Sequence, residues 1–228
     1  FASYGLQTVG ITMTTISKSA FITGTSVLMV PMFAALFLKR MPDRSSLLGA
    51  FMAFVGLGLM TLTGGSTEAG ASAGLNLGDL LTLLCAVGFA LYILAVGKYT
   101  VQVDSVPFAI VQLGTVAVFS AAASFAFETP VVPSGGNAWF AILFLAIVCT
   151  SMAFIVQNVA QKYTTSTHTA LIFSGEPVFA AMFAYVVVGE VLGMNGIIGG
   201  GLILLGMLVA ELNVLEWLMP KKQSSEAV

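Results

Sequence analysis

Long apolar runs separated by short polar segments set the pattern of this chain. Each run is close to the ~20 residues that an α-helix needs to cross the hydrocarbon core of a bilayer. Six of the runs carry no charged residue, and the seventh carries a single acid, Glu176. The pattern predicts seven complete transmembrane helices: Ser19–Leu38, Ser46–Thr63, Leu80–Gly97, Val106–Phe127, Ala138–Gln157, Thr169–Val188 and Val191–Ala210.

A further apolar segment, Phe1–Met13, precedes these runs but is too short to cross a bilayer. The chain does not begin with Met, and no basic leader stands before an apolar core as it would in a signal peptide. We expect this segment to be the remainder of an incomplete helix. The predicted fold class is therefore an all-α polytopic membrane protein with eight helical segments, of which the first is truncated.

Composition supports a membrane protein and excludes several other classes. Apolar residues make up 58% of the chain and charged residues 8%, against ~45–50% and ~25% in soluble proteins. The mean hydropathy is +1.01. A net charge of −2 argues against nucleic acid as a partner. We expect Cys85 and Cys149, each within an apolar run, to be buried thiols. One histidine, His168, excludes a site with several His ligands, and we expect no metal or cofactor.

Positive charges predict the orientation of the helices, because Lys and Arg concentrate in cytoplasmic loops. Loops on alternate sides of the predicted bundle carry seven of these residues on one side and one, Lys18, on the other. We expect a multi-pass protein of the cell (inner) membrane with a cytoplasmic C-terminus. The seven residues on the expected cytoplasmic side are Lys39, Arg40, Arg44, Lys98, Lys162, Lys221 and Lys222.

The two halves of the chain resemble each other. A shift of 150 residues aligns Leu6–Leu62 with Val156–Leu212 without a gap and gives twelve identities in 57 positions. The shift carries a helix across five spans, an odd number, so the two copies must lie oppositely in the membrane. Such inverted repeats are typical of transporters. We expect glycines of the repeat to permit close helix packing, namely Gly49, Gly56, Gly196, Gly199, Gly200 and Gly206.

Three stretches of the chain are similar to a known family. Gln161–Glu190 resembles the ninth-helix signature of EamA-type members of the drug/metabolite transporter superfamily, and Gly78–Lys98 resembles their sixth helix. Ser19–Arg40, together with Gly49–Gly58, resembles the fourth and fifth helices. One departure stands at a helix end, where the first repeat has Lys39 and Arg40 in place of the Gly and Glu of the second.

The resemblance implies ten helices arranged as five plus five, of which this chain lacks the first two and part of the third. Residues 1–63 would then be the remainder of the first EamA repeat, with helices 3 to 5. Residues 64–78 would be an extracytoplasmic loop, residues 79–212 the second repeat with helices 6 to 10, and residues 213–228 a cytoplasmic tail.

Glu176 is the most informative polar residue, since it lies eighth in its predicted span. A rise of 1.5 Å per residue places it ~5 Å from the bilayer midplane, where a charge costs at least ~2.5–3.5 kcal/mol. Such an acid must face a cavity, find a partner or retain a proton. We predict that it contacts substrate and couples transport to protons. The alternative is a protonated acid that holds two helices together.

Two prolines occupy corresponding spans of the two repeats, Pro31 in the first and Pro177 in the second. A proline within a helix removes one backbone donor, and breaks in equivalent helices of a repeat mark substrate sites in transporters. We therefore predict helix breaks at both prolines. The alternative is that membrane helices tolerate proline without a functional reason.

Other polar side chains at membrane depth are candidate substrate contacts. Ser and Thr often bond to their own helix backbone, so a structural role stands beside the binding role for these residues. An amide in an apolar run needs partners, which a cavity supplies. The candidates are Gln112, Tyr92, Ser174, Thr23 and Ser26.

Polar residues near the predicted helix ends have simpler interpretations. Asp79 is interpreted as a helix cap, and Gln157 and Asn158 as interfacial residues. His168 is interpreted as interfacial, with a proton-relay role as the alternative.

The function that these residues favour is secondary active transport. The resemblance implies export of an amino acid or related small metabolite by proton exchange, and no ATP-binding P-loop is present. A membrane-embedded enzyme lacks an intramembrane Asp pair, and a retinal receptor lacks a mid-helix lysine. A structural or receptor protein without transport activity remains the alternative. The expected partners are a small-molecule substrate, protons and the lipid bilayer, and a homodimer is left open.

Overall fold

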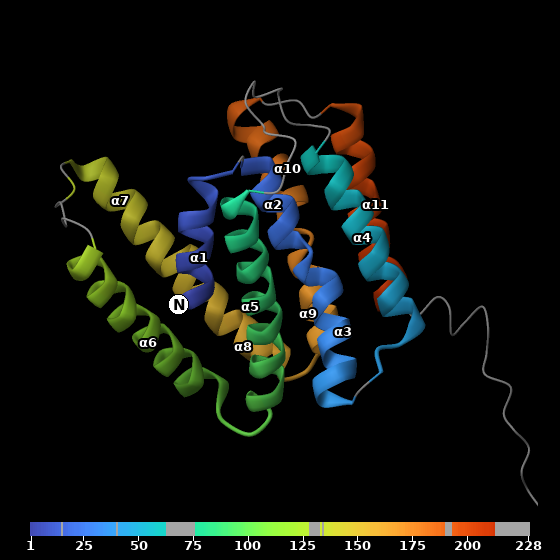
Figure 1. Cartoon of the computed structure of the whole chain (residues 1–228), viewed down its shortest axis with the longest axis horizontal. Coiled ribbons are helices and arrows are strands. Elements are labelled where there is room, and N and C mark those ends of the chain that lie inside the picture. Colours follow the sequence, from blue (N-terminus) through green and yellow to red (C-terminus); the bar gives the residue numbers. More distant parts are fainter. Residues whose placement is uncertain are drawn as a thin grey trace, which may run out of the picture. The chain divides into compact units, whose positions relative to one another are not determined.

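The computed structural model is helical throughout the part of the chain that it describes, which comprises residues 1–14, 16–39, 41–62, 76–127, 133, 135–189 and 193–212. The elements, labelled in Figure 1, are α1 (Ala2–Ile11), α2 (Ile16–Gly24), α3 (Ser26–Leu38), α4 (Arg44–Leu62), α5 (Leu77–Tyr99), α6 (Ser105–Phe127), α7 (Gly136–Phe144), the π-helix η1 (Leu145–Met152), α8 (Ala153–Gln161), α9 (Ser166–Phe173), α10 (Glu176–Val188) and α11 (Met194–Glu211). Most of the predicted loop 64–78 and the predicted tail 213–228 lie outside the described residues.

Within those residues, seven helical spans are long and apolar enough to cross a membrane. They match the seven predicted runs, and the all-α polytopic fold is confirmed. Three of the spans are composite: α2 continues into α3, α9 into α10, and α7 through η1 into α8. The spans are Lys18–Leu38, Arg44–Thr61, Leu77–Tyr99, Ser105–Phe127, Gly136–Gln161, Ser166–Val187 and Met194–Glu211.

The chain divides into two compact units, and each is described by itself. The smaller unit contains Phe1 and residues 95–165, and the larger unit contains residues 2–94 and 166–228. In the smaller unit, the span from α7 to α8 exposes nearly all of its apolar side chains, as a lipid-facing helix would. Cys149 in this span is exposed, so the expectation that it is buried was wrong, whereas Cys85 in the larger unit is buried.

Equivalent helices of the larger unit repeat with a constant offset. α3 begins at Ser26 and α10 at Glu176, and α4 and α11 begin at Arg44 and Met194, so each pair is separated by 150 residues. The C-terminal caps repeat as well. Lys39 after α3 and Gly189 after α10 are both left-handed, with φ of 52° and 75°, and their N–H groups bond to Ala34 and Ala184. Left-handed caps of this kind end many helices.

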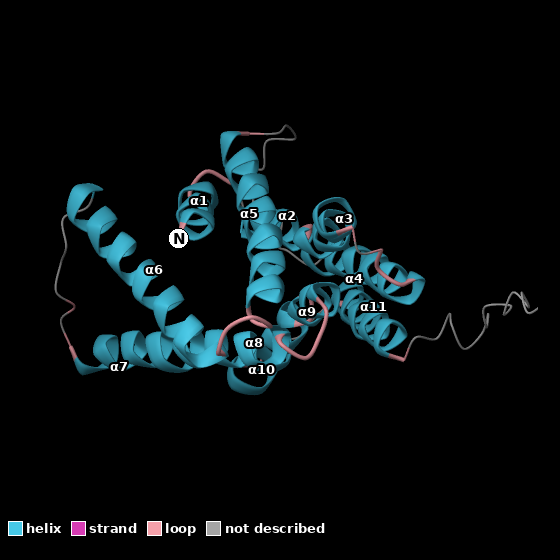
Figure 2. Ribbon diagram, turned by 90° about the horizontal axis from the view of Figure 1, so that it is seen from below, coloured by secondary structure: helices cyan, strands magenta, loops and turns pink. Residues whose placement is uncertain are grey.

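Helices α4 and α11 lie side by side and antiparallel, with their backbones in contact (Figures 1 and 2). A Cβ added at Gly49 would lie 2.4 Å from the carbonyl oxygen of Gly206, and one added at Gly199 would lie 2.4 Å from that of Gly56. Gly49 and Gly199 are repeat equivalents, as are Gly56 and Gly206. The contact is therefore reciprocal, as a two-fold relation requires.

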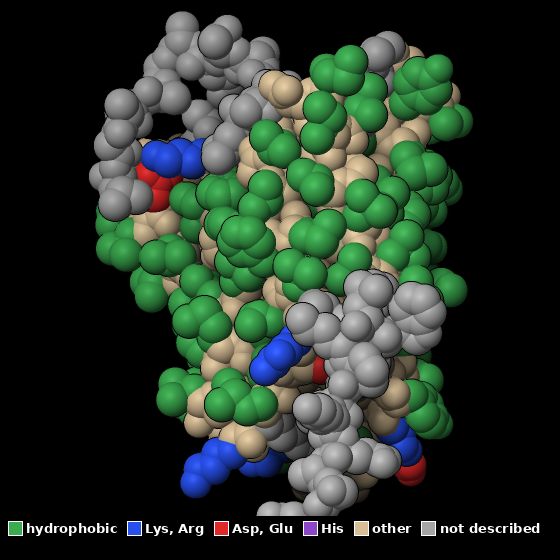
Figure 3. Space-filling view, turned by 90° about the vertical axis from the view of Figure 1, so that its right-hand side faces the viewer, with side chains coloured by type: hydrophobic (Ala, Val, Ile, Leu, Met, Phe, Trp, Pro, Cys, Tyr) green, Lys and Arg blue, Asp and Glu red, His purple; other side chains and the backbone are tan. Residues whose placement is uncertain are grey.

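The core of the larger unit is built from small and branched side chains. One cluster joins α3, α5 and α9 through residues such as Val30, Ala90 and Ala170. Two others join α4 and α11 to their neighbours around Ala53, Leu171 and Ile203. Figure 3 shows that hydrophobic side chains cover the middle of the outer face over α4 and α11, with Lys and Arg side chains nearer its ends. This distribution suits a bilayer on that face.

Asp43 caps the start of α4. Its carboxylate accepts hydrogen bonds from the backbone N–H of Ser46, at 2.8 Å, and from the Ser46 hydroxyl, at 2.7 Å. These bonds satisfy a donor that the helix leaves free. Desolvation acts to raise the pKa of Asp43, but the bonds from Ser46 lower it by more, so this pKa lies below its usual value.

We predict that Gly199→Ala destabilises the protein by about 1–3 kcal/mol, because the added methyl group meets backbone rather than a movable side chain. The matched control is Gly201→Ala in the same helix, where the added methyl group meets no atom within 4 Å. That control should be neutral or stabilise by up to about 1 kcal/mol. Thermal unfolding of the detergent-solubilised protein measures both changes, and equal midpoints for the two variants would contradict the backbone contact.

A second prediction concerns pH. A depressed folded-state pKa stabilises the fold above the unfolded value, about 3.9, and this contribution is lost as pH falls through the folded value. Wild type should therefore be more stable than Asp43→Asn near neutral pH, and the difference should shrink in acid. Unfolding midpoints measured across this range test it. Asp104→Asn, which removes an exposed carboxylate just before α6, is the control for loss of charge alone.

Candidate functional site

Glu176 is the first residue of α10, directly after an interruption of the membrane span at Ser174 and Gly175. The interruption is tightly wound: the Gly175 N–H bonds to Ile172, while the N–H groups of Val178 and Phe179 bond back to Gly175. The Glu176 side chain is exposed. Its place in the first turn of a helix explains how a carboxylate is tolerated there, because the helix dipole favours negative charge at that end.

The equivalent interruption in the first repeat lies at Thr25. Its N–H bonds to Ile22, and Leu28 and Met29 bond back to its carbonyl oxygen. The helix that follows begins with Ser26, the repeat equivalent of Glu176, and Ser26 is half-buried. Both repeats therefore build the same break, but only the second carries an acid at it.

The predicted breaks at the prolines are displaced in the structure. α3 continues through Pro31, which is buried within it, and the span is interrupted earlier, at Thr25. Pro177 is the second residue of α10, so it follows the break rather than causing a kink inside a continuous helix. Proline is favoured in the first turn of a helix because the N–H that it lacks would have no partner there.

A tyrosine that the sequence did not single out accompanies Glu176. Tyr4 of α1 is close enough to Glu176 for the two groups to interact electrostatically. Its ring packs edge-on against Phe89 of α5, with centroids 5.3 Å apart. The approach of α1 to α5 is close, because a Cβ on Gly88 would collide with the side chain of Ser3. Tyr4 lies in the short N-terminal segment, where no span-length run drew attention to it.

The other candidates in the larger unit have different surroundings. Thr23 of α2 has a buried hydroxyl without a hydrogen-bond partner in the described part of the chain. Ser174 is buried and donates to the carbonyl oxygen of Leu171 at 2.5 Å, the structural role weighed for it. Tyr92 of α5 is half-buried against the cluster around Val30.

Gln112 lies in the smaller unit, on α6, where its partner is an amide. Asn158 of α8 donates to the Gln112 side-chain oxygen at 3.0 Å and to the Phe154 carbonyl oxygen at 2.9 Å. Asn158 is fully buried, so its interpretation as an interfacial residue was wrong. Its side-chain oxygen has no partner among the described residues. The signal that could have found it is spacing, because Phe154, Asn158 and Gln161 share one helix face, and both amides are buried.

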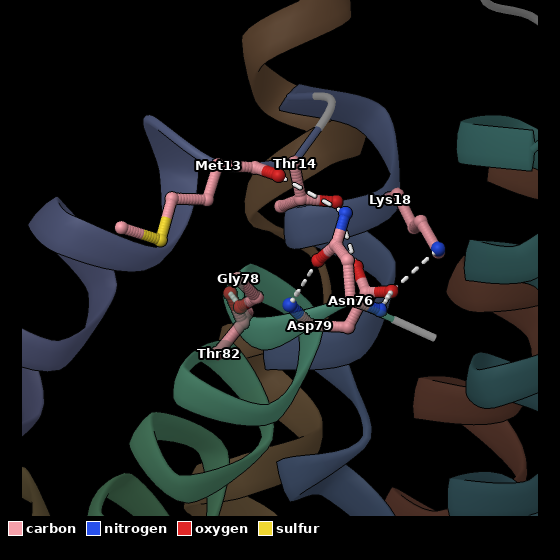
Figure 4. Close-up of polar contacts among 7 residues, drawn as sticks. All are labelled: Met13, Thr14, Lys18, Asn76, Gly78, Asp79 and Thr82. Atoms are coloured by element: carbon pink, nitrogen blue, oxygen red, sulfur yellow. Dashed lines mark hydrogen bonds and ion pairs between the residues drawn. The ribbon is translucent and has the colours of Figure 1, made fainter. Parts of the chain in front are cut away.

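An ion pair between half-buried Lys18 and buried Asp79 joins α2 to the start of α5 (Figure 4). Lys18 donates to Asp79 at 2.5 Å, and only 1% of the Asp79 side chain is exposed. Thr14 donates to the other carboxylate oxygen at 2.7 Å. Asn76 and Asp79 also bond reciprocally, with the Asn76 N–H on the carboxylate and the Asp79 N–H on the Asn76 side chain. This is a capping box in which Asn76 is the cap and Asp79 is the acid in the first turn that bonds back to it. Asp79 thus takes part in capping its helix, though not as the cap residue itself, and it binds a lysine as well.

A second polar contact joins α4 to α9. The Ser46 hydroxyl, already bonded to Asp43, lies 3.0 Å from Nε2 of His168. Ser46 is 1% exposed, whereas His168 is half-buried. His168 thus contacts another helix through a hydroxyl, and its interpretation as a residue at the interface did not include this partner.

Comparisons with known proteins agree with this architecture. The model of the EamA-like transporter family matches residues 76–212. An uncharacterized transporter of Archaeoglobus fulgidus is 33% identical over 215 residues, which cover 94% of this chain and 66% of that protein. The uncharacterized transporter YyaM of Bacillus subtilis is 28% identical over 227 residues, covering 92% of this chain and 69% of that protein. The chain thus spans about two thirds of these relatives.

A solved crystal structure of a protein has the same fold. Its TM-score is 0.79, with 21% sequence identity over 92% of this chain and 74% of that one. The family match covers more than half of the chain and contains α5 to α11. With seven membrane-capable spans, a break in equivalent helices and an acid at one of them, the chain belongs to the EamA-like transporter family.

Proposed function

We propose that this protein is a secondary active transporter that exports a small metabolite, an amino acid or related compound, in exchange for protons. Membership of a transporter family, and relatives that are named transporters, support transport over an enzymatic activity. The substrate class, the direction and the coupling ion go further than these comparisons. They rest on the chemistry of Glu176 and its surroundings.

The observation that carries the proposal is the position of Glu176. An acid at membrane depth begins a half-helix, has an exposed side chain, and forms no ion pair with a basic side chain in the described part of the chain. Its repeat equivalent, Ser26, carries no charge. It begins α3, whose two ends both lie 150 residues before those of α10. The fold therefore forms this helix start without an acid, and the energetic cost of a carboxylate at this depth calls for a functional reason.

The surroundings of Glu176 favour a substrate with an amino group. A carboxylate attracts an ammonium directly, and the rings of Tyr4 and Phe89 offer the aromatic faces that cations also bind. Thr23 has a buried hydroxyl without a partner among the described residues, and we propose it as a further contact. An amino acid or related amine fits these groups, with Tyr92, Ser26 and Ser174 of the same unit as further candidate contacts.

The cycle that we propose uses one group for two ligands. Glu176 is ionised when substrate binds from the cytoplasm, because the carboxylate is then the partner of the substrate's amine. A proton from the outside replaces the substrate, and the neutral acid allows the carrier to return. Because the substrate and a proton bind to the same carboxylate in turn, export of the substrate requires a proton to move inward. The interruption at Ser174 and Gly175 supplies a joint at which α10 can move relative to α9.

The orientation that we propose puts the C-terminus in the cytoplasm. The exception to the positive-inside pattern, Lys18, is ion-paired with buried Asp79. Its charge is thereby neutralised within the fold, so it weighs little against the seven Lys and Arg residues on the other side.

We predict that Glu176→Gln abolishes proton-driven accumulation of substrate and leaves facilitated movement down the substrate's own gradient measurable. Glutamine preserves the size and a hydrogen-bonding end but cannot titrate, so the exchange of proton for substrate is lost. The measurement is uptake of candidate amino acids into proteoliposomes of the intact protein, with and without an imposed pH gradient. A drop of about 10²-fold or more in gradient-driven uptake is expected, since removal of an essential proton-transfer group costs 10²–10⁴-fold.

The matched control is Glu211→Gln, which removes an exposed acid at the end of α11. It should accumulate substrate as wild type does. Wild-type accumulation by Glu176→Gln would contradict the coupling role and leave the acid as a contact between helices.

A further inference from the structure

Two of the polar contacts described above, Lys18–Asp79 and Ser46–His168, lie at opposite ends of the helices of the larger unit. Lys18 and Asp79 stand where α2 and α5 begin. His168 stands where α9 begins, and Ser166 beside it contacts the carbonyl oxygen of Ile93 near the other end of α5, at 3.5 Å. The fourteen residues between Asp79 and Ile93 correspond to about 21 Å along the helix.

Lys18 and His168 are also equivalent in the repeat, because they are 150 residues apart, the offset that relates α3 to α10 and α4 to α11. Each lies in the half of its span that comes before the interruption, Lys18 in α2 and His168 in α9. Each contacts a group beside the start of another helix: Asp79 in the first turn of α5, and Ser46 with its partner Asp43 at the start of α4. Repeat-equivalent residues therefore make polar contacts at opposite ends of the helices. Lys18 does so where α5 begins, and His168 does so where α4 begins.

The first contact belongs to a tight closure. Near Asp79, the backbones of α1 and α5 touch: a Cβ on Gly78 would lie 2.7 Å from the carbonyl oxygen of Gly10. The side chain of Asn76 donates to the carbonyl oxygen of Met13 at 3.0 Å, across the same junction (Figure 4). A buried ion pair contributes little to net stability, but losing one partner leaves an unpaired charge that favours separation of the elements.

The second contact, from His168 through Ser46 to Asp43, is not a direct ion pair. It passes through the Ser46 hydroxyl rather than from cation to carboxylate, and Asp43 is half-buried where Asp79 is buried. The two ends are thus held by unequal bonds, which start from the equivalent residues Lys18 and His168 but reach partners on helices that are not equivalent, α5 and α4. A carrier with inverted repeats exposes its site alternately, by exchanging the local arrangements of the two repeats.

We propose that these contacts are two latches, each built on one of the repeat-equivalent residues Lys18 and His168: Lys18–Asp79 holds one end of the larger unit's helices closed, and His168–Ser46–Asp43 holds the other. During the cycle one latch opens while the other stays closed. Their use in transport rests on the proposed function, whereas the latches themselves are a property of the fold and can be tested without any substrate.

The test measures access to a thiol at mid-depth. Ser26→Cys is introduced into a Cys85→Ala, Cys149→Ala background of the intact protein, in membrane vesicles of both orientations. A membrane-impermeant maleimide is applied from one side at a time. Minor conformations of such proteins are ~0.1–10% populated. Asp79→Asn should therefore raise the labelling rate about tenfold or more from the side of the first latch only. Ser46→Ala should do so from the opposite side only.

Three variants make the result decisive. Asp79→Asn keeps the shape of the side chain and one acceptor oxygen for the Asn76 N–H, while its NH2 group can donate to the Thr14 hydroxyl, so it removes the ion pair and leaves the capping box in place. Lys18→Gln, which removes the cation of the same ion pair, should raise the labelling rate from the same side as Asp79→Asn does. Lys98→Ala, which removes an exposed lysine near the end of α5, should change neither side.

Equal increases from both sides, or none, would overturn the latches, because loosening of the whole bundle has no sidedness. Failure of the proposed transport function gives a different result: sided labelling is retained although no substrate moves. Active transport without sided labelling would overturn the latches alone.

Discussion

The hydrocarbon core of a bilayer contains no water, so every polar group within it must find its partner inside the protein. Continuous helices meet this demand for the backbone, and most of the chain consists of them. The places where the demand is hardest to meet are few. They are the interruptions at Thr25 and at Ser174–Gly175, the amide pair of Gln112 and Asn158, and the ion pair of Lys18 and Asp79. These places include the groups to which we assign the proposed function.

The interruptions illustrate how the constraint and the proposed chemistry meet. Each joint is closed by short-range backbone bonds, and the dipole of the helix that follows favours negative charge at the residue where it starts. In one repeat that residue is Ser26, in the other Glu176. The geometry comes from the repeat and is present twice, whereas the charge is present once. A symmetric scaffold with one asymmetric acid is a simple way to obtain a single binding site from a duplicated fold.

The fold could be predicted well from the sequence, because membrane spans are defined by length and hydrophobicity and these are local properties. The repeat was also accessible, since an offset of 150 residues aligns polar and apolar positions without a gap, and equivalent helices carry that offset. The glycines of α4 and α11 were identified as packing residues for the same reason, and the structure confirms backbone contact at Gly49, Gly56, Gly199 and Gly206.

The partners of polar residues were not predictable in the same way. Nothing local to Asp79 indicates Lys18, 61 positions earlier, and nothing local to Ser46 indicates His168, 122 positions later. Asn158 stands near a helix end in the sequence, yet α6 covers it. The prolines indicated the right spans but not the right positions. Proline lacks a backbone donor, yet the interruptions lie before the prolines, at Thr25 and at Ser174–Gly175.

The cap that ends α3 shows how topology can override conformational preference. The left-handed backbone of Gly189 suits glycine, but the equivalent residue, Lys39, adopts the same conformation with a full side chain, at a cost of roughly 1–2 kcal/mol. A glycine there would relax the backbone and delete a cation from the end of the bundle that carries most of them. The chain thus keeps a positively charged side chain at this helix end together with local backbone strain, where the equivalent helix end in the second repeat has an unstrained glycine and no charge.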